Sequence, residues 1–216
     1  VCSSDLAIEI SPDFGKAFYY RGVLYTLRGN ADRALADYGE ATRLEPQNPE
    51  GLIGRAGIYV RMGNFDGAIK DYDAAIKLQP TDPALYYNLG YALFGKGEYE
   101  RALADYRRAV GLNTSLGPAY INLCLTQVII GKELEKAMVD CNRATQLLPQ
   151  NVDAATTRAI ALLKMGDIAK ALPAFDAALK IEPGQARALY GRGLAKAKNG
   201  DKAGADADMA TRSEEH

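Results

Sequence analysis

Glycine returns at a nearly constant interval along this chain of 216 residues. The interval is 34 residues, with one step of 35, through Gly29, Gly63, Gly97, Gly131, Gly166 and Gly200. A column of alanines and a column of large residues keep the same period. The alanines are Ala34, Ala68, Ala102, Ala137, Ala171 and Ala205, and the large residues are Tyr38, Tyr72, Tyr106, Cys141, Phe175 and Met209. A period of roughly 20 to 50 residues shared by several columns indicates a repeat array, in which each unit packs against its neighbours.

Each period contains two helical segments separated by its glycine. In the second period, apolar side chains recur at helical spacing over residues 52–59 and again over residues 65–76. Gly63 lies between these segments, and glycine supplies the turn that commonly ends a helix. Pro80 follows the second segment and prevents that helix from continuing. We therefore predict an all-α fold of stacked antiparallel helix pairs.

Two further columns carry a resemblance to a known family. A small residue recurs in every first helix, at Gly22, Ala56, Gly90, Cys124, Ala159 and Gly193. A proline closes most periods, at Pro12, Pro46, Pro80, Pro149 and Pro183, with Thr114 in the one place that lacks it. With the alanine column, this pattern resembles the tetratricopeptide repeat (TPR) family. The resemblance implies a right-handed α-solenoid whose first helices line a concave ligand groove.

The period divides the chain into six expected units. They span residues 15–48, 49–82, 83–116, 117–151, 152–185 and 186–211, and residues 6–14 resemble the tail of a preceding unit. The unit at 117–151 holds one extra residue between Gly131 and Ala137, and the unit at 186–211 is truncated in its second helix. We expect a longer turn at the extra residue.

The two ends of the chain do not fit the repeat. Residues 1–5 can be encoded by a DNA string, GTG TGC TCT TCC GAT CT, whose reverse complement encodes Arg-Ser-Glu-Glu-His, the sequence of residues 212–216. The string also resembles a common sequencing adapter. We therefore expect residues 1–5 and 212–216 to be adapter-derived, and the true N-terminus to be missing.

Composition argues against several classes of function. Lys+Arg and Asp+Glu number 26 and 27 and are dispersed, so we expect no nucleic-acid partner. No apolar stretch approaches the ~20 residues that cross a bilayer, so we expect a soluble chain without membrane insertion, cytoplasmic or periplasmic. The single histidine is His216, and no glycine-rich phosphate loop is present. We therefore expect no catalytic residue, metal site or cofactor, and no enzyme; compartment and oligomeric state stay open.

Other columns are interpreted as packing. The large residues lie opposite the small column, so we expect them to fill the gap between paired helices. Arginines recur in the first helices and aspartates in the second, and we expect them to form partly buried ion pairs. These residues are Arg21, Arg55, Arg158 and Arg192, with Asp37, Asp71, Asp105, Asp140 and Asp208. Cys124 and Cys141 are expected to face each other as reduced core thiols, with a disulfide as the alternative in an oxidising compartment.

By the family resemblance, residues exposed on the first helices form the ligand groove, and several are aromatic or aliphatic. The peptide-binding candidates are Tyr19, Tyr20, Val23, Ile53, Tyr87, Asn88, Tyr91, Phe94, Ile121, Asn122, Leu125 and Tyr190, with Lys16, Thr156 and Leu194 beside them. Tyrosine and phenylalanine are frequent anchors of a partner. Asn88 and Asn122 are placed to hydrogen-bond a ligand backbone.

Some members of the family grip a carboxylate terminus with Lys, Asn and Arg. The equivalent positions here include Tyr19, Val23, Ile53 and Gly57, which cannot do so. We predict a protein–protein interaction scaffold or adaptor that binds an apolar peptide or helix. The competing interpretation is a non-catalytic, substrate-recruiting arm of a larger enzyme or signalling protein.

Overall fold

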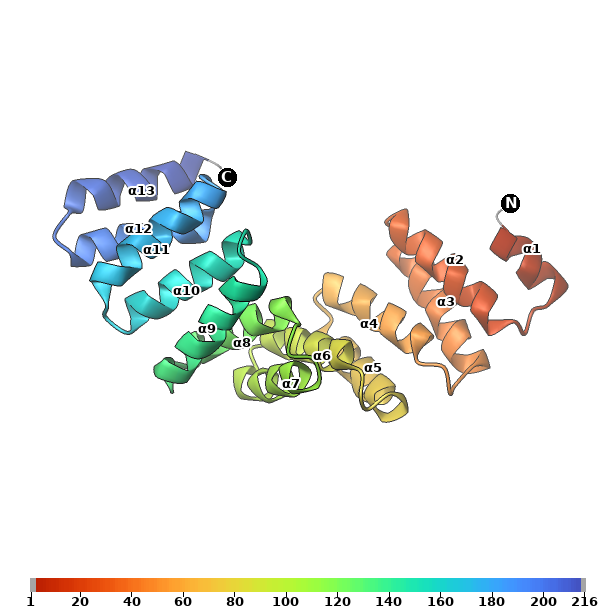
Figure 1. Cartoon of the computed structure of the whole chain (residues 1–216). Coiled ribbons are helices and arrows are strands. Elements are labelled where there is room, and N and C mark those ends of the chain that lie inside the picture. Colours follow the sequence, from red (N-terminus) through yellow and green to blue (C-terminus); the bar gives the residue numbers. More distant parts are fainter. Residues whose placement is uncertain (1–2, 215–216) are drawn as a thin grey trace. The chain divides into compact units, whose positions relative to one another are not determined.

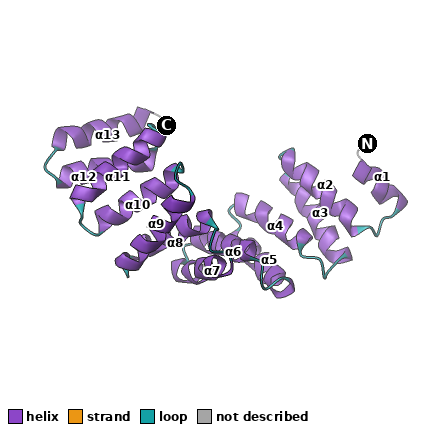
Figure 2. Cartoon of the chain, viewed as in Figure 1, coloured by secondary structure: helices purple, strands orange, loops and turns teal. Residues whose placement is uncertain are grey.

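The computed structural model describes the backbone of residues 3–214 and the side chains of residues 4–210. Within that range every regular element is a helix, and short loops join the helices (Figure 1 and Figure 2). The helices are α1 (Ser3–Ile10), α2 (Gly15–Leu27), α3 (Ala31–Leu44), α4 (Glu50–Arg61), α5 (Phe65–Leu78), α6 (Pro83–Lys96), α7 (Tyr99–Leu112), α8 (Gly117–Ile130), α9 (Leu134–Leu147), α10 (Val152–Lys164), α11 (Ile168–Ile181), α12 (Ala186–Lys198) and α13 (Lys202–Glu214).

The ends expected to be adapter-derived lie partly outside this range. Val1, Cys2, Glu215 and His216 are outside the described residues. Residues 3–5 belong to α1, and residues 212–214 belong to α13.

The chain divides into two compact halves, named here the N-terminal half, up to Leu112, and the C-terminal half, from Asn113. In the N-terminal half α2 packs on α3, α4 on α5, and α6 on α7, and α3–α4 and α5–α6 contacts join the pairs. In the C-terminal half the pairs are α8 with α9, α10 with α11, and α12 with α13, joined through α9–α10 and α11–α12. Each half is a stack of helix pairs, so the predicted all-α solenoid class is confirmed.

The glycines that set the period end the first helix of each pair. All six have φ between 72° and 89°, in the left-handed region that glycine enters without steric cost. Gly97 and Gly131 are the residues directly after α6 and α8, and their amides donate to carbonyls of the last turn. One residue separates Gly97 from α7, whereas two separate Gly131 from α9, and the second of these, Glu133, has φ 52°. The extra residue of this period therefore lies in the turn.

Small and large residues meet between the paired helices. A Cβ added to Gly90 on α6 would lie 2.8 Å from the ring of Tyr106 on α7, and one added to Gly22 would lie 2.9 Å from Tyr38. Tyr106 and Phe175 are fully buried, and Tyr38 and Tyr72 nearly so. The prediction that the large column packs in the core is confirmed, because the rings fill space that the missing Cβ atoms leave.

Candidate ligand groove

Two adjoining cavities open between α4, α5 and α6 in the N-terminal half. The smaller, of about 240 Å³, is lined by Gly57, Val60, Tyr72, Tyr87, Asn88 and Tyr91. The larger, of about 350 Å³, is lined by Val60, Arg61, Phe65, Tyr91, Phe94 and Gly95. Val60 and Tyr91 belong to both, so the cavities form one depression, named here the α4–α6 groove. The groove contains four of the predicted peptide-binding residues: Tyr87, Asn88, Tyr91 and Phe94.

Helix spacing and one small residue keep the groove open. Among the described helices, α2 approaches α4 closely, as α8 approaches α10 and α10 approaches α12, whereas α4 and α6 do not come as close. Gly57 faces the resulting space from α4, and no atom lies within 4 Å of the place where its Cβ would stand. Gly95, on α6, is covered instead, because a Cβ there would lie 2.5 Å from the Phe65 ring.

Aromatic side chains of α6 form one wall of the groove. The rings of Tyr87 and Tyr106 lie with centroids 6.1 Å apart, so core packing orients Tyr87. The Phe94 ring stands edge-on to Tyr99, with centroids 5.3 Å apart. Tyr91 lies between Tyr87 and Phe94 along the helix and is 48% exposed. The exposed Tyr91 ring thus lies between the rings of Tyr87 and Phe94, which contacts with Tyr106 and Tyr99 fix in place. This arrangement suits contact with an apolar group.

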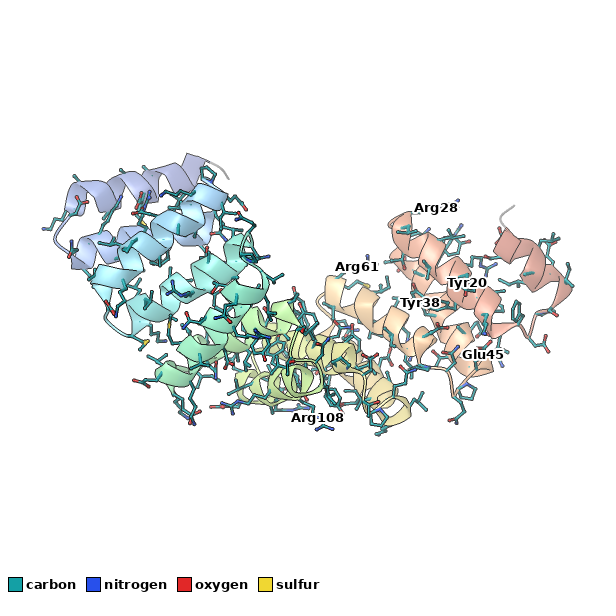
Figure 3. All side chains as sticks on the ribbon, viewed as in Figure 1. Tyr20, Arg28, Tyr38, Glu45, Arg61 and Arg108 are labelled. Atoms are coloured by element: carbon teal, nitrogen blue, oxygen red, sulfur yellow. A yellow bond between two sulfur atoms is a disulfide. The ribbon has the colours of Figure 1, made fainter. Side chains whose placement is uncertain are left out.

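Few groups in the groove carry charge. Burial, followed by the nearby carboxylate of Asp71, raises the pKa of Tyr72 to about 12, so its hydroxyl stays neutral. Lys96, close to the groove on α6, is paired with Asp66 at 2.8 Å and Glu98 at 2.7 Å. Arg61 lies at the end of α4 (Figure 3), and in the described part of the chain it forms no ion pair. The groove is therefore apolar, with one available cation at its edge.

The remaining candidates of the N-terminal half lie on α2 and α4. Tyr19 and Val23 pack against the core cluster around Ala34 and Tyr38, and burial raises the pKa of the Tyr19 hydroxyl. Tyr20 is 58% exposed (Figure 3), and its ring meets that of Tyr19 edge-on at 5.4 Å. Ile53 is half-buried, and Lys16 is exposed. Tyr19 and Val23 therefore contribute to packing as well as to the surface.

The candidates of the C-terminal half differ in exposure. The expectation that Ile121 and Thr156 are exposed is wrong. Ile121 packs in a cluster with Ala144 and Ala154, and Thr156 is fully buried. Asn122 and Leu125 are half-buried, whereas Tyr190 and Leu194 are 43% and 37% exposed.

Sequence reasoning missed part of the groove. Val60 and Arg61 were not among the candidates, and Phe65 and Tyr72 were assigned to the core only. Val60 lies three residues after Gly57 and hence on the same face of α4, a spacing that identifies it once Gly57 is known to be exposed.

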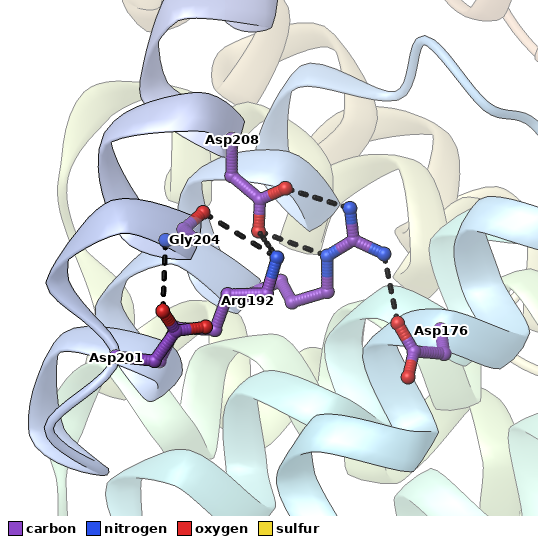
Figure 4. Close-up of polar contacts among 6 residues, drawn as sticks. Asp176, Arg192, Asp201, Gly204 and Asp208 are labelled. Carbon is purple, nitrogen blue, oxygen red and sulfur yellow. Dashed lines mark hydrogen bonds and ion pairs between the residues drawn. The ribbon is translucent and has the colours of Figure 1, made fainter.

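Arginine–aspartate pairs link the helices of three units, as predicted. Arg55 donates from Nε and Nη2 to the two carboxylate oxygens of Asp71, at 2.7 and 2.8 Å. The same bidentate geometry joins Arg21 to Asp37, and Arg192 to Asp208. Arg192 also donates to Asp176 of the preceding second helix, at 2.7 Å (Figure 4).

The ion pairs of Asp208 favour its ionised form. Burial alone would raise the pKa of Asp208, but hydrogen bonds from Arg192 and Lys196 outweigh it, so the pKa is lowered. The hydrogen bond to Asp71 likewise raises the pKa of Arg55. The pairs therefore hold charge in partly buried positions that require it to be matched.

Cys124 of α8 and Cys141 of α9 form a disulfide, with Cα atoms 5.2 Å apart. The expectation of reduced thiols is wrong, and the alternative holds. The two positions belong to the small and the large column, and a cysteine at each brings the sulfur atoms together between the paired helices.

Neither metal binding nor membrane crossing gains support from the described residues. They contain no group of three or more His, Cys, Asp or Glu side chains arranged to hold a metal ion. None of the helices in residues 3–214 has the length and apolar character needed to span a bilayer.

The helix pairs, turn glycines and small–large packing define a repeat protein of the tetratricopeptide class, and the chain belongs to the tetratricopeptide repeat family. Four sequence models of that family match residues 25–70, 56–97, 83–115 and 156–208. Together the matches run through most of the periods identified above. No curated protein matches the sequence significantly.

Solved structures of other proteins share the fold. The TPR protein YrrB, described as having an unusual peptide-binding site, is 23% identical, with a TM-score of 0.74 over 87% of this chain and 96% of that chain. The MamA protein is 26% identical, with a TM-score of 0.71 over 80% and 94%. A tetratricopeptide repeat protein from Parabacteroides merdae is 20% identical, with a TM-score of 0.75 over 98% and 84%.

Proposed function

We propose that this protein is an interaction scaffold that binds a peptide segment of a partner protein in the α4–α6 groove. The observation that carries the proposal is the open, aromatic-walled depression at Gly57. The segment inserts one aromatic or branched aliphatic side chain beside Tyr91, where a half-exposed ring is available for burial. Asn88 offers an amide to the peptide backbone, and Arg61 favours an acidic residue next to the inserted side chain.

The comparisons support this class of function. YrrB, which shares the fold, is a TPR protein with a peptide-binding site. The lining of the α4–α6 groove is also consistent with such a role, because exposed tyrosine and arginine side chains are frequent energetic centres of protein interfaces. Apolar cavities with few polar groups bind ligands mainly through burial of apolar surface.

The test is a selection of peptides from a random display library on the full chain, followed by fluorescence anisotropy of the selected peptides. The variant Gly57→Leu places a side chain in the smaller cavity, and its Cβ meets no atom within 4 Å. The matched control is Gly111→Leu on α7, where the Cβ site is also open and the residue is exposed outside the groove. Both substitutions replace a helical glycine by a better helix former, so neither should impair folding.

We expect Gly57→Leu to abolish binding and Gly111→Leu to leave it unchanged. Tyr91→Ala should weaken binding by about 2 kcal/mol, as truncation of an interface anchor commonly does. Peptides that bind Gly57→Leu as tightly as the original chain would contradict the proposal. The recruiting-arm interpretation uses the same groove, so this experiment tests the binding site that both interpretations share.

A further inference from the structure

Arg158 on α10 occupies the same place in its unit as Arg21, Arg55 and Arg192, but it lacks their partner. Those three arginines hold the carboxylate of an aspartate 16 residues later, on the second helix of the unit. The residue 16 positions after Arg158 is Ala174, on α11. A methyl group thus stands where the other three units present a carboxylate.

The guanidinium of Arg158 therefore makes fewer hydrogen bonds than those of the other three arginines. Its Nε donates to Oδ1 of Asn142 on α9, at 2.8 Å. No ion pair forms with Arg158 in the described part of the chain. The guanidinium carries five donors in a planar fork, so its two terminal nitrogens stay available for a bidentate carboxylate.

Alanine in place of aspartate at position 174 leaves open space next to Arg158 as well as hydrogen-bond donors without an acceptor. Two cavities, of about 400 and 340 Å³, adjoin at Arg158, Ala174 and Ala177. The larger also has Asn142, Thr145 and Gln146 in its wall. The smaller is lined by Lys170 and by Pro173, a proline inside α11. This depression, named here the Arg158 pocket, has a cation, polar groups and room for an incoming side chain.

Its walls also indicate what carries the incoming group. Ala155, Ala174, Ala177 and Ile181 provide small and apolar surface around the guanidinium. Such surface suits the methylene carbons and backbone of a protein segment better than a hydrated free ion. The chain itself solves the same recognition problem three times with a carboxylate carried on a helix.

We propose that the Arg158 pocket is a second interaction site, which binds an aspartate or glutamate side chain presented by a partner protein. The acidic side chain takes the place of the absent aspartate and accepts two hydrogen bonds from the terminal nitrogens of Arg158. This site lies in the C-terminal half, on α9, α10 and α11, and shares no residue with the α4–α6 groove. The two proposed sites can therefore be tested independently of each other.

The chain provides a specific competitor for this site. In the variant Ala174→Asp, the carboxylate is supplied by the protein, with the spacing found at Asp37, Asp71 and Asp208. We expect this carboxylate to accept hydrogen bonds from Arg158 and to raise the thermal unfolding temperature. The matched control Ala174→Asn has nearly the same shape without the charge, so it should raise the unfolding temperature less than Ala174→Asp.

The experiment is a display selection of helical peptides on the full chain, counter-selected on Ala174→Asp. We expect the enriched peptides to contain a Glu or Asp whose replacement by Gln or Asn lowers affinity about tenfold or more, as loss of a charge-assisted pair does. Arg158→Gln should cause the same loss, and the two losses should not add. The side-chain Nε–H resonance of Arg158 should shift with the Glu peptide and not with its Gln counterpart.

Three results would overturn the proposal. One is a set of peptides that binds the original chain and Ala174→Asp equally well, with circular dichroism showing both folded. Another is full binding by the Gln counterparts. The last is an equal Arg158 shift with sodium acetate and with the Glu peptide at the same concentration, because the site would then take free carboxylates rather than a protein segment. If Ala174→Asp fails to fold, Arg158→Gln with the same peptide pair gives the same decision.

Discussion

The guanidinium of Arg55 and the carboxylate of Asp71 form a bidentate pair across the two helices of one unit, at 2.7 and 2.8 Å. The aspartate side chain is only 5% exposed, whereas that of the arginine is 25% exposed. The pair thus holds a nearly buried carboxylate that has little access to bulk water. Arg55 stabilises the folded state mainly by compensating this charge, because removal of one partner leaves an uncompensated ion in a buried position.

Arg55→Met should therefore destabilise the protein by about 2 to 4 kcal/mol, because Asp71 loses its partner in a buried position. Urea unfolding followed by circular dichroism measures this change. The control Arg43→Met breaks an exposed pair with Glu40, which solvent screens, and should change stability far less than Arg55→Met does. Adding Asp71→Leu to Arg55→Met should restore much of the loss; a double variant as unstable as the single one would contradict this explanation.

A pH dependence is expected where the arginine column is interrupted. Leu89 occupies the arginine position 16 residues before Asp105, so Asp105 lacks the arginine that pairs with Asp37, Asp71 and Asp208 in their units. Burial, and then the carboxylate of Asp73, raise the pKa of Asp105 to about 6. The nearby Arg101 lowers the pKa of Asp105 but does not outweigh the effects that raise it. The folded state therefore binds this proton more tightly than the unfolded state, whose ordinary pKa is 3.8. The contribution of Asp105 to stability should be most favourable below about pH 4 and decline as the pH rises to about 6.

Asp105→Asn isolates this contribution. The stability of the variant relative to the original chain should improve between pH 4 and pH 7, measured by urea unfolding at each pH. Leu89→Arg should have a similar effect by supplying the missing cation between Asp73 and Asp105, and NMR titration should show a lowered pKa for Asp105. A difference between Asp105→Asn and the original chain that does not vary with pH would contradict the raised pKa.

Gly57 and Gly90 offer opposite predictions for one substitution. Gly90→Ala should destabilise by about 1 to 3 kcal/mol, because its Cβ would lie 2.8 Å from the Tyr106 ring in a filled core. Gly57→Ala should stabilise by up to about 1 kcal/mol, because its Cβ meets open space and alanine favours the helix. Thermal unfolding of both variants checks the pair. Equal shifts in the same direction would contradict the packing described at these two helices.

The period predicted most of the fold because its columns record local physical requirements. Glycine recurs at the repeat position of Gly131 because the helix end needs a positive φ. A small residue recurs at the repeat position of Gly90 because a large ring, here that of Tyr106, fills the space beside it. The ion pairs were also predictable, because arginine and aspartate recur at a fixed spacing within the unit. Apart from the contact of Arg192 with Asp176, each of these contacts lies inside one helix pair, where sequence separation determines distance.

The groove was harder to predict, because the exposure of its residues depends on contacts between units. The spacing of residues in the sequence does not determine those contacts. Ile121 occupies the same repeat position as Tyr87, yet it is buried with Ala144 and Ala154. Tyr87 instead lines an open groove, because α4 and α6 stand farther apart and Gly57 contributes no side chain. The exposure of a repeat position therefore depends on the side chains of the next unit, and the sequence pattern of one unit cannot supply it.

The disulfide between Cys124 and Cys141 leads to a prediction about reduction. It closes a loop with a sequence separation of 17 residues between α8 and α9. A cross-link of this span stabilises by roughly 3 kcal/mol in the chain-entropy account, mainly by restricting the unfolded state. Dithiothreitol should therefore lower the thermal unfolding temperature measured by circular dichroism. Cys124→Ala/Cys141→Ala should have the lower unfolding temperature without reductant and should not respond to it. Alkylation in denaturant should modify both cysteines only after reduction; modification of both in the unreduced protein would contradict the disulfide.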